Sequence, residues 1–462
     1  MATNDAPLML SVSGARGIVG QTMTPTVAAE FAAAFGSWIR SRVPGRPRLC
    51  VGRDGRAGGE ALAAAARGGL AGVGCDVVDL GVTMTPTVGV MIGHLGGAGG
   101  MEITASHNPL EWNGLKCLDS DGLAPPPSIA ADIIARFRDR NFSFVGSTEV
   151  GRITGDSSGA ETHIAKVLAQ VDLAAIRARR FKVALDSINA SGCVPGRMLL
   201  ERLGCEVTHL NGEPTGVFAH VPEPTEANLV DLAAAVRAGG GLAAGFAQDP
   251  DGDRLAIVDG NGRYIGEEYT LVLAALRLLQ RRGKGTLAAN LSTSRMIDDI
   301  AAGFPGSRVV RTAVGEANVV VGLKEHRGIL GGEGNGGVIL PEVCLVRDSL
   351  TAMALALDLL AADGRPLAAI VDGLPRYAML KTKLDLAAVG GAAAVAPALA
   401  KVRAAFAKER LDDRDGIRID LADGWVHLRA SNTEPIVRVI AEAPTRERAE
   451  RLVADCRAAA GL

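Results

Sequence analysis

Residues 249–254 read DPDGDR and stand between two apolar runs, GLAAGFAQ before them and LAIVD after them. The runs predict two buried strands joined by an acidic loop. Asp249, Asp251 and Asp253 alternate along the chain, so their side chains point to one side of an extended segment. The proline between them fixes one backbone dihedral, and the glycine permits a tight curl. The loop therefore predicts three converging carboxylates.

Three carboxylates this close repel one another unless a positive charge lies between them. Oxygen ligands without Cys or His nearby favour Mg²⁺. An EF-hand loop is excluded, because its sixth and twelfth positions would be Arg254 and Gly260 instead of Gly and Glu. An aspartyl-nucleophile phosphatase carries a similar DxDG string, but we expect Thr or Val where Asp253 stands. A solvated acidic turn is a third interpretation, disfavoured by the apolar flanks.

The composition indicates a large globular protein with no polyanionic partner. The chain has 462 residues, 48% of them hydrophobic and 22% charged, which predicts three or four domains. A net charge of −2 gives no electrostatic footprint for nucleic acid or an anionic membrane. We therefore expect a small-molecule substrate, and neither nucleic acid nor membrane as a partner.

Targeting and redox signals favour the cytoplasm. The N-terminus, MATNDAPLML, lacks a basic region followed by an apolar core. The uncharged stretch Leu80–Met101 contains Pro86 and His94, which argue against a membrane-spanning helix. Seven cysteines are scattered without a CxxC pair, which is typical of reduced thiols rather than of disulfides or a zinc site.

A strand–helix–strand pattern occurs three times and predicts α/β domains of similar topology with mixed sheets. Its strands read RPRLCVGRD and CDVVDLG, FKVALDS and CEVTHL, and TLAANLS and RVVRTAV. In the second and third copies we expect the helix over 195–204 and 294–303.

The C-terminal part predicts a smaller α+β domain. We expect an Ala-rich helical stretch from about 375 to 408, an antiparallel hairpin with DG turns over 415–443, and a final helix over 445–459. The predicted domains are 1–155, 156–258, 259–375 and 376–462.

The string MEITASHNP, residues 101–109, predicts a strand that ends in a loop presenting Ser106 and His107. A serine at a strand end can serve as a covalent nucleophile or phosphoacceptor. The alternative is a turn in which Ser106 only binds local backbone. The chain has no GxSxG elbow, which disfavours a hydrolase triad.

Five segments together resemble the α-D-phosphohexomutase superfamily in order and spacing, over essentially the whole chain. They are TASHNP at 104–109, EWNGLK at 111–116, DPDGDR at 249–254, GGEGNGG at 331–337 and RASNTEP at 429–435. The resemblance implies an α/β fold of four domains around a central cleft. It also implies that Ser106 carries a phosphoryl group and, with Asp249, Asp251 and Asp253, binds one Mg²⁺.

The resemblance further implies the reaction and its cofactors. Phospho-Ser106 gives its group to one hydroxyl of a hexose or hexosamine monophosphate, and the other phosphate of the resulting bisphosphate returns to Ser106. A sugar bisphosphate would act as activator or primer, and the enzyme would be a monomer or homodimer. A cation bridging the phosphate fits this chemistry, because phosphoryl transfer spreads negative charge over the moving oxygens.

Three cations match positions that act near the transferred group in this superfamily: Arg16 in SGARG, Lys116 in EWNGLK and Arg254 in DPDGDR. On residue type alone, Lys116 could equally be solvated surface and Arg254 a partner of the adjacent carboxylates. We expect His107 to hold its loop by a hydrogen bond beside the substrate rather than to act as a general base.

The GGEGNGG string contains a formal GxGxxG, but the dinucleotide interpretation fails, because the strand-like VILPE follows it instead of a helix. The resemblance implies that Glu333 and Asn335 bind sugar hydroxyls. Many bacterial members carry His where Gly337 stands, so a role of that His must fall elsewhere or be absent.

The Asn–Gly–Gly version and WNGLK are similar to the phosphoglucosamine mutase group of archaea and some bacteria. We therefore expect interconversion of glucosamine 6-phosphate and glucosamine 1-phosphate. The alternatives are phosphomannomutase or phosphoglucomutase activity by the same mechanism and, more distantly, a sugar-phosphate-binding protein without turnover.

The RASNTEP loop places a guanidinium, two hydroxyls and an amide together before a proline. In the superfamily this loop grips the phosphate that is not transferred, which implies that role for Arg429, Ser431, Asn432 and Thr433. A polar turn joining two strands is the alternative. We expect Arg438 to lie on the following strand as a structural residue.

Overall fold

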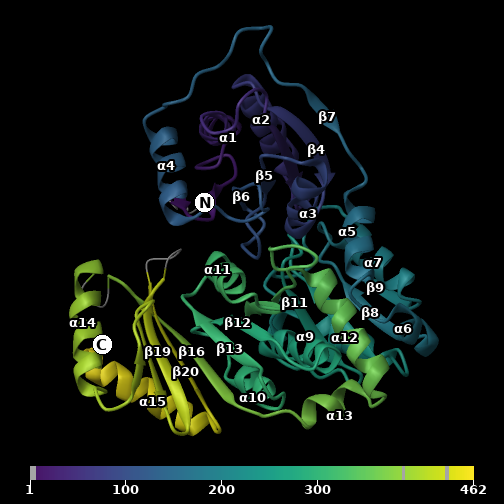
Figure 1. The fold of residues 1–462 in the computed structure, drawn as a ribbon, viewed down its shortest axis with the longest axis vertical. Helices are drawn as coiled ribbons and strands as arrows, with labels where there is room; N and C mark the ends of the chain where they lie inside the picture. The colour runs from purple at the N-terminus through teal and green to yellow at the C-terminus, as the bar shows by residue number, and fades with distance from the viewer. Residues whose placement is uncertain (1–6, 388–390, 432–435) are drawn as a thin grey trace. The chain divides into compact units, whose positions relative to one another are not determined.

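The computed structural model describes residues 7–387, 391–431 and 436–462 (Figure 1). The chain divides into two compact units. The first comprises Met1–Leu278 and Asn335–Asp372, and the second comprises Leu279–Gly334 and Gly373–Leu462.

The first unit opens with a seven-stranded mixed sheet of order β1-β2-β6-β5-β3-β4-β7. Its elements are β1 (Met9–Ser11), β2 (Gly14–Ile18), α1 (Pro25–Arg40), β3 (Arg48–Arg53), α2 (Gly59–Gly72), β4 (Asp76–Val82), α3 (Thr85–Leu95), β5 (Gly99–Ile103), β6 (Trp112–Leu118), α4 (Pro127–Arg138) and β7 (Ile153–Gly155). Strand β3 is parallel to β4 and β5, whereas β5 and β6 are antiparallel.

Both faces of this sheet are covered by helices. Apolar side chains of α1, α2 and α4 pack on one face, and those of α3 pack on the other. The Ala-rich helices α1 and α2 approach closely, because a Cβ atom at Gly69 would lie 2.3 Å from the carbonyl oxygen of Ala29. The close packing of these helices on the sheet fixes the strand ends, including the end of β5 that precedes Ser106.

The first unit also holds a second, four-stranded sheet of order β11-β10-β8-β9. Its elements are α5 (Gly159–Leu168), α6 (Leu173–Arg179), β8 (Lys182–Asp186), α7 (Cys193–Arg202), β9 (Glu206–Leu210), the 3₁₀ turn η1 (Glu226–Asn228), α8 (Val230–Ala238), β10 (Ala244–Gln248) and β11 (Leu255–Asp259). The unit is completed by most of α9 (Glu267–Arg282) and by β15 (Gly337–Ile339), α12 (Ser349–Asp363) and α13 (Leu367–Asp372).

The second unit begins with three parallel strands in the order β13-β12-β14. Its first elements are β12 (Thr286–Asn290), α10 (Met296–Ala302), β13 (Arg308–Thr312), α11 (Glu316–His326) and β14 (Leu330–Glu333). The parallel triplets β9-β8-β10 and β4-β3-β5 repeat this order, which confirms the predicted likeness of topology. The helices expected over 195–204 and 294–303 are α7, which begins and ends two residues earlier, and α10, which is shorter than expected.

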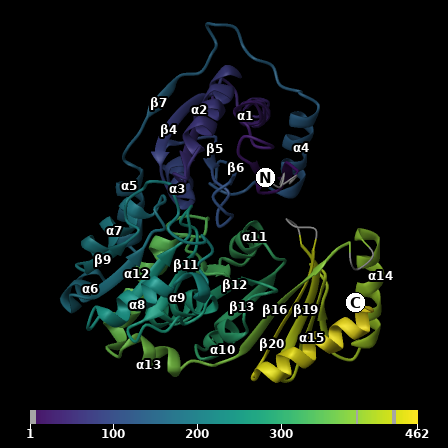
Figure 2. The ribbon, with the colours of Figure 1, turned by 180° about the vertical axis from the view of Figure 1, so that it is seen from behind.

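The C-terminal part of the second unit is a five-stranded antiparallel sheet of order β16-β20-β19-β18-β17. Its elements are β16 (Ala378–Asp385), α14 (Ala392–Ala405), β17 (Arg410–Asp412), β18 (Ile417–Leu421), β19 (Gly424–Ala430), β20 (Ile436–Ala443) and α15 (Arg446–Ala460). Helices α14 and α15 cover one face, where Val402 and Leu452 pack against Ile419 (Figures 1 and 2). The smaller α+β domain predicted here is confirmed.

The prediction of a helical stretch from about 375 to 408 was wrong for its first residues. Residues 378–385 form β16, which pairs antiparallel with β20. The segment AMLKTKLD alternates polar and apolar residues, and Leu380 and Leu384 pack on the core. This period of two favours a strand and outweighs the helical tendency of the Ala-rich sequence that follows. The predicted domain limits at 155, 258 and 375 stay a prediction.

Candidate active site

The acidic loop joins the antiparallel strands β10 and β11, as the apolar flanks predict. Asp249, Asp251 and Asp253 are fully buried, and a carboxylate oxygen of each lies within 4.8 Å of the others. Gly252 has a φ of +68°, and a Cβ atom there would lie 2.4 Å from the Met84 side chain. The three carboxylates therefore converge, because the loop can make a left-handed turn at Gly252.

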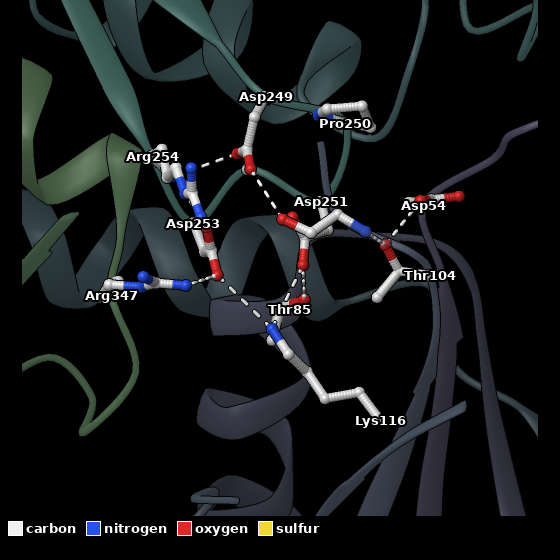
Figure 3. A network of polar contacts seen from close by, with 12 residues as sticks. Asp54, Thr85, Thr104, Lys116, Asp249, Pro250, Asp251, Asp253, Arg254 and Arg347 are labelled. Atoms are coloured by element: carbon white, nitrogen blue, oxygen red, sulfur yellow. Dashed lines mark hydrogen bonds and ion pairs between the residues drawn. The ribbon is translucent and has the colours of Figure 1, made fainter. Parts of the chain in front are cut away.

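Each carboxylate is held on one side by hydrogen-bond donors (Figure 3). The backbone N–H of Arg254 donates to Oδ1 of Asp249 at 3.0 Å. Thr85 Oγ1 and Lys116 Nζ donate to Oδ2 of Asp251 at 2.8 and 3.2 Å. The donors to Oδ2 of Asp253, at 2.5 and 3.4 Å, are Arg347 Nη2 and Lys116 Nζ.

On the other side, two buried oxygens, Asp251 Oδ1 and Asp253 Oδ1, accept no hydrogen bond from any residue that the structure describes. Burial and the two neighbouring carboxylates raise the pKa of Asp249 well above its usual value. Burial also acts to raise the pKa of Asp253, but the nearby cations, Arg347 first, outweigh it and hold that pKa below its usual range. Buried oxygens without donors, in a set of hard ligands, fit a divalent cation such as Mg²⁺.

Ser106 reaches this cluster from the first sheet. It follows β5, adopts a φ of +49°, and is buried with its Oγ 3.2 Å from Oδ2 of Asp249. A positive φ is uncommon for a residue with a side chain and indicates that surrounding contacts impose the conformation. The two most informative segments of the sequence thus meet at one point.

Those contacts come from residues that the sequence analysis did not single out. The Arg56 guanidinium is fully buried and donates to the backbone carbonyls of Ser106 and Trp112. Asp54 accepts from Arg56 Nε at 2.8 Å and from Thr104 Oγ1 at 2.6 Å. The sequence did offer a signal for this pair. In GRDGR, residues 52–56, Asp54 and Arg56 directly follow an apolar run, and charges near a buried strand must be paired.

The remaining predicted cations and His107 surround Ser106. Arg16 Nη1 donates to Asn108 Oδ1 at 3.2 Å, and burial lowers the pKa of Arg16. Arg254 Nε lies 3.8 Å from Asp253 Oδ1. His107 Nδ1 lies 3.4 Å from Ser106 Oγ, and the charge of Arg254, together with burial, lowers the pKa of His107 well below its usual value. His107 is therefore neutral near pH 7.

Glu333 and Asn335 flank the boundary between the two units. In the second unit, Glu333 ends β14 and accepts from Asn290 Nδ2 at 2.8 Å and from the Gly315 N–H at 3.2 Å. In the first unit, Asn335 Oδ1 accepts from the Gly337 N–H at 3.3 Å. The strand β15, rather than a helix, follows the glycine-rich loop, in agreement with the rejection of a dinucleotide site.

In the second unit, Arg429 and Ser431 lie at the end of β19. Arg429 Nε donates to Asp415 Oδ2 at 3.0 Å, while its buried Nη2 makes no hydrogen bond within the described ranges. The Ser431 N–H donates to the Ile436 carbonyl at 2.9 Å. Asn432 and Thr433 lie outside the described residues. Arg438 lies on β20, as expected.

Comparisons with known proteins identify the family. The four domain models of phosphoglucomutase/phosphomannomutase match residues 9–143, 161–262, 266–377 and 382–459; the first three are described as α/β/α domains I to III and the last as the C-terminal domain. The chain belongs to the phosphoglucomutase/phosphomannomutase family. The resemblance to the phosphohexomutases is thereby confirmed, and the chain is an enzyme of this isomerase class, with four domains.

Similar family members come from several organisms. A "Phosphoglucomutase/phosphomannomutase" of Thermococcus kodakarensis is 38% identical over 94% of each chain. A "Probable phosphoglucosamine mutase" of Methanopyrus kandleri is 35% identical over 95% of each chain. The crystal structure of a phosphoglucomutase/phosphomannomutase family protein from Burkholderia thailandensis superposes with a TM-score of 0.85 at 28% identity, covering 98% of this chain and 96% of that one.

The uncharged stretch Leu80–Met101 contains the short helix α3. None of the helices in the described part of this mutase is long and apolar enough to cross a membrane.

Proposed function

We propose that this mutase interconverts glucosamine 6-phosphate and glucosamine 1-phosphate and that Ser106 carries the phosphoryl group. The main support is one contact: Ser106 Oγ lies 3.2 Å from Asp249 Oδ2, beside two buried carboxylates with oxygens that lack donors. A hydroxyl next to a site that suits a divalent cation is placed for phosphoryl transfer.

In the proposed cycle, phospho-Ser106 meets a free hydroxyl of the sugar monophosphate. The bond between phosphorus and Ser106 Oγ breaks, a bond to the sugar oxygen forms, and the proton of the sugar hydroxyl ends on Ser106 Oγ. The sugar bisphosphate then presents its other phosphate, and the reverse transfer restores phospho-Ser106. A sugar bisphosphate supplied from solution would phosphorylate Ser106 of an unphosphorylated chain. The enzyme would act as a monomer or homodimer.

Asp249, Asp251 and Asp253, with an oxygen of phosphorylated Ser106, would hold one Mg²⁺, which when bound neutralises charge on the transferring phosphoryl group. Lys116 connects Asp251 and Asp253 through its ammonium group. Because this ammonium group contacts the same carboxylate cluster as Ser106 Oγ, it would stabilise the negative charge of the transition state.

Arg16 and Arg254 would add positive charge around Ser106. Their side chains are largely buried, which strengthens the attraction to a phosphate by removing competing water. Neutral His107 would donate or accept a hydrogen bond near the substrate rather than remove a proton.

Substrate recognition would use the glycine-rich loop and the loop that follows β19. Glu333 and Asn335 offer a carboxylate and an amide, a suitable pair for vicinal sugar hydroxyls. Arg429, Ser431, Asn432 and Thr433 would bind the phosphate that is not transferred. For Arg429 the support is its Nη2 atom, which is buried and makes no hydrogen bond within the described ranges.

The choice of glucosamine rests on the Asn335–Gly336–Gly337 sequence and on the 35% identical relative named a probable phosphoglucosamine mutase. The 38% identical relative, named phosphoglucomutase/phosphomannomutase, supports the second candidate, the same reaction on glucose or mannose phosphates. The discriminating experiment measures kcat/KM for the 1-phosphates of glucosamine, glucose and mannose on one preparation. We expect the highest value for glucosamine 1-phosphate, and a clear lead for mannose or glucose would transfer the proposal to the second candidate.

A further inference from the structure

Arg347 contacts the acidic loop of residues 249–254, although it lies outside all five motifs of the sequence. It stands in the segment between β15 and α12, immediately before Asp348, the N-cap of α12. Its Nη2 donates to Asp253 Oδ2 at 2.5 Å, and its side chain is 11% exposed. Arg347 binds Oδ2 of Asp253, whereas the oxygen that accepts no hydrogen bond from a described residue is Oδ1.

The path of the Arg347 side chain requires a glycine at 337. A Cβ atom at Gly337 would lie 2.2 Å from Arg347 Cδ, far inside van der Waals contact. The backbone of Gly337 is outside the left-handed region, so contacts alone oppose a side chain there, mainly the one with Arg347 and less severely one of 3.1 Å with Asn335 Oδ1. The glycine-rich loop therefore leaves the room through which Arg347 reaches the acidic loop.

The backbone around Arg347 is fixed at several points. The Asp348 N–H donates to the Val338 carbonyl at 2.8 Å, and the Asp348 carboxylate caps α12 and lies 3.0 Å from His163 Nε2. Ser349 Oγ donates to the carbonyl of Gly252, inside the acidic loop, at 2.7 Å. Arg347 thus extends from a segment that is itself hydrogen-bonded to the loop that Arg347 contacts.

We propose that Arg347 is a positioning residue that orients Asp253 for the cation. By holding Oδ2, it directs Oδ1 into the site, where no described residue donates to it. An arginine suits this role because its guanidinium is planar and permanently charged, whereas Lys116 is divided between Asp251 and Asp253. This inference rests on the proposed function, since it assumes that the three carboxylates bind the metal.

Two roles of Arg347 predict opposite effects on Mg²⁺ affinity and can therefore be distinguished. If Arg347 were only a counter-charge that occupies the site while the metal is absent, its removal would strengthen Mg²⁺ binding. If it orients the ligand, its removal weakens binding, and hydrogen-bonded partners of metal ligands typically contribute about 10–100-fold in metal affinity or activity.

The test measures Mg²⁺ affinity by calorimetric titration, and Mn²⁺ binding by electron paramagnetic resonance, on the full-length chain. We expect Arg347→Ala to weaken binding by about tenfold or more and Arg347→Lys to restore part of it. Arg365→Ala removes an exposed pair with Asp363 and serves as the control with unchanged affinity. Unchanged or tighter binding by Arg347→Ala would overturn the proposal.

Gly337→Ala provides a second, independent variant, because it leaves the arginine present but blocks its path. We expect Gly337→Ala to lower Mg²⁺ affinity about as much as Arg347→Ala, and the double variant to show no further loss. Additive losses in the double variant would contradict the geometry. Gly68→Ala, at a helical glycine with open space, is the neutral control.

The Mg²⁺ titration, together with an assay of phosphoryl transfer from a sugar bisphosphate, separates this inference from the proposed function. If the wild-type chain neither binds Mg²⁺ nor accepts a phosphoryl group from a sugar bisphosphate, the proposed function fails. If the wild type does both and Arg347→Ala equals it, only the role of Arg347 is wrong.

Discussion

The hydroxyl of Thr85 donates a 2.8 Å hydrogen bond to Oδ2 of Asp251, and the backbone N–H of Thr85 donates to the Asp251 carbonyl at 2.9 Å. Thr85 begins α3, so the first turn of a helix on the first sheet holds the central residue of a loop on the second. The acidic loop is therefore held in place by two sheets of the first unit and not by its own sequence alone.

Thr85→Val should weaken the site with little change of shape. The substitution removes the 2.8 Å hydrogen bond and leaves Lys116 Nζ, at 3.2 Å, donating to Asp251 Oδ2; a buried acceptor that loses a partner costs about 1–3 kcal/mol. We expect weaker Mg²⁺ binding and a lower kcat/KM. Thr85→Ser, which keeps the hydroxyl, should stay close to wild type, and equal Mg²⁺ affinities for Val and Ser would contradict the role of this bond.

Arg56→Met should destabilise the protein more than any exposed arginine variant. The change leaves the Asp54 carboxyl group buried without its ion-pair partner and removes the donors to the Ser106 and Trp112 carbonyls. Breaking a buried pair from one side costs about 3–5 kcal/mol. Urea unfolding checks this, with Arg197→Met, which removes an exposed helical pair, as the control. Equal midpoints for the two variants would refute the prediction.

Removing divalent cations should abolish turnover and lower thermal stability together. The three buried carboxylates repel one another without a bridging ion, and a ligand at about 100 times its Kd stabilises by about 2.7 kcal/mol. Differential scanning fluorimetry with EDTA and with Mg²⁺ measures the shift. Asp251→Asn should show a much smaller shift, and a shift of wild-type size in that variant would speak against metal binding at these residues.

His427 should make the second unit sensitive to acid. Burial lowers its pKa to about 4, against about 6.5 in an unfolded chain. Its Nε2 lies 2.6 Å from the Asp415 carbonyl, which can only accept, so the neutral ring donates there and accepts from Ser292 at Nδ1. Between the two pKa values the unfolded chain binds a proton that the folded chain excludes. This contribution to stability is complete above about pH 6.5 and lost as pH falls towards 4.

We therefore expect the melting temperature of the wild type to fall more steeply between pH 6.5 and 4 than that of His427→Gln. Thermal melts across this range provide the measurement. Parallel pH profiles for the two chains would rule out a role of His427 in the acid sensitivity.

The sequence contained enough to predict the main chemistry of the site. The convergence of the DPDGDR carboxylates could be predicted from local geometry, with alternate residues on one side and a glycine at the turn, although donors far away in the chain hold the side chains in place. The strand-end loop with Ser106 was equally local. The repeated strand–helix–strand pattern predicted the α/β domains because period and turn chemistry are also short-range signals.

The site residues that could not be predicted from the sequence share one property: their roles depend on partners far away in the chain. Arg347 is 94 residues from Asp253 and Thr85 is 166 residues from Asp251, so neither lies in a motif with the residue that it contacts. A lone arginine or threonine reads as surface or helix cap until the fold brings its partner close. The strand β16 was missed for a different reason, since an Ala-rich neighbour masked its period-two alternation.

Phosphoryl transfer to Ser106 tests the central claim most directly. The purified chain, treated with phosphatase and then with a hexose or hexosamine 1,6-bisphosphate and Mg²⁺, is measured by intact-mass and peptide mass spectrometry. We predict a mass gain of one phosphoryl group, located on Ser106 and absent in Ser106→Ala. A chain that gains no phosphoryl group, or gains it on Asp249 in the Ser106→Ala variant as well, would contradict the account.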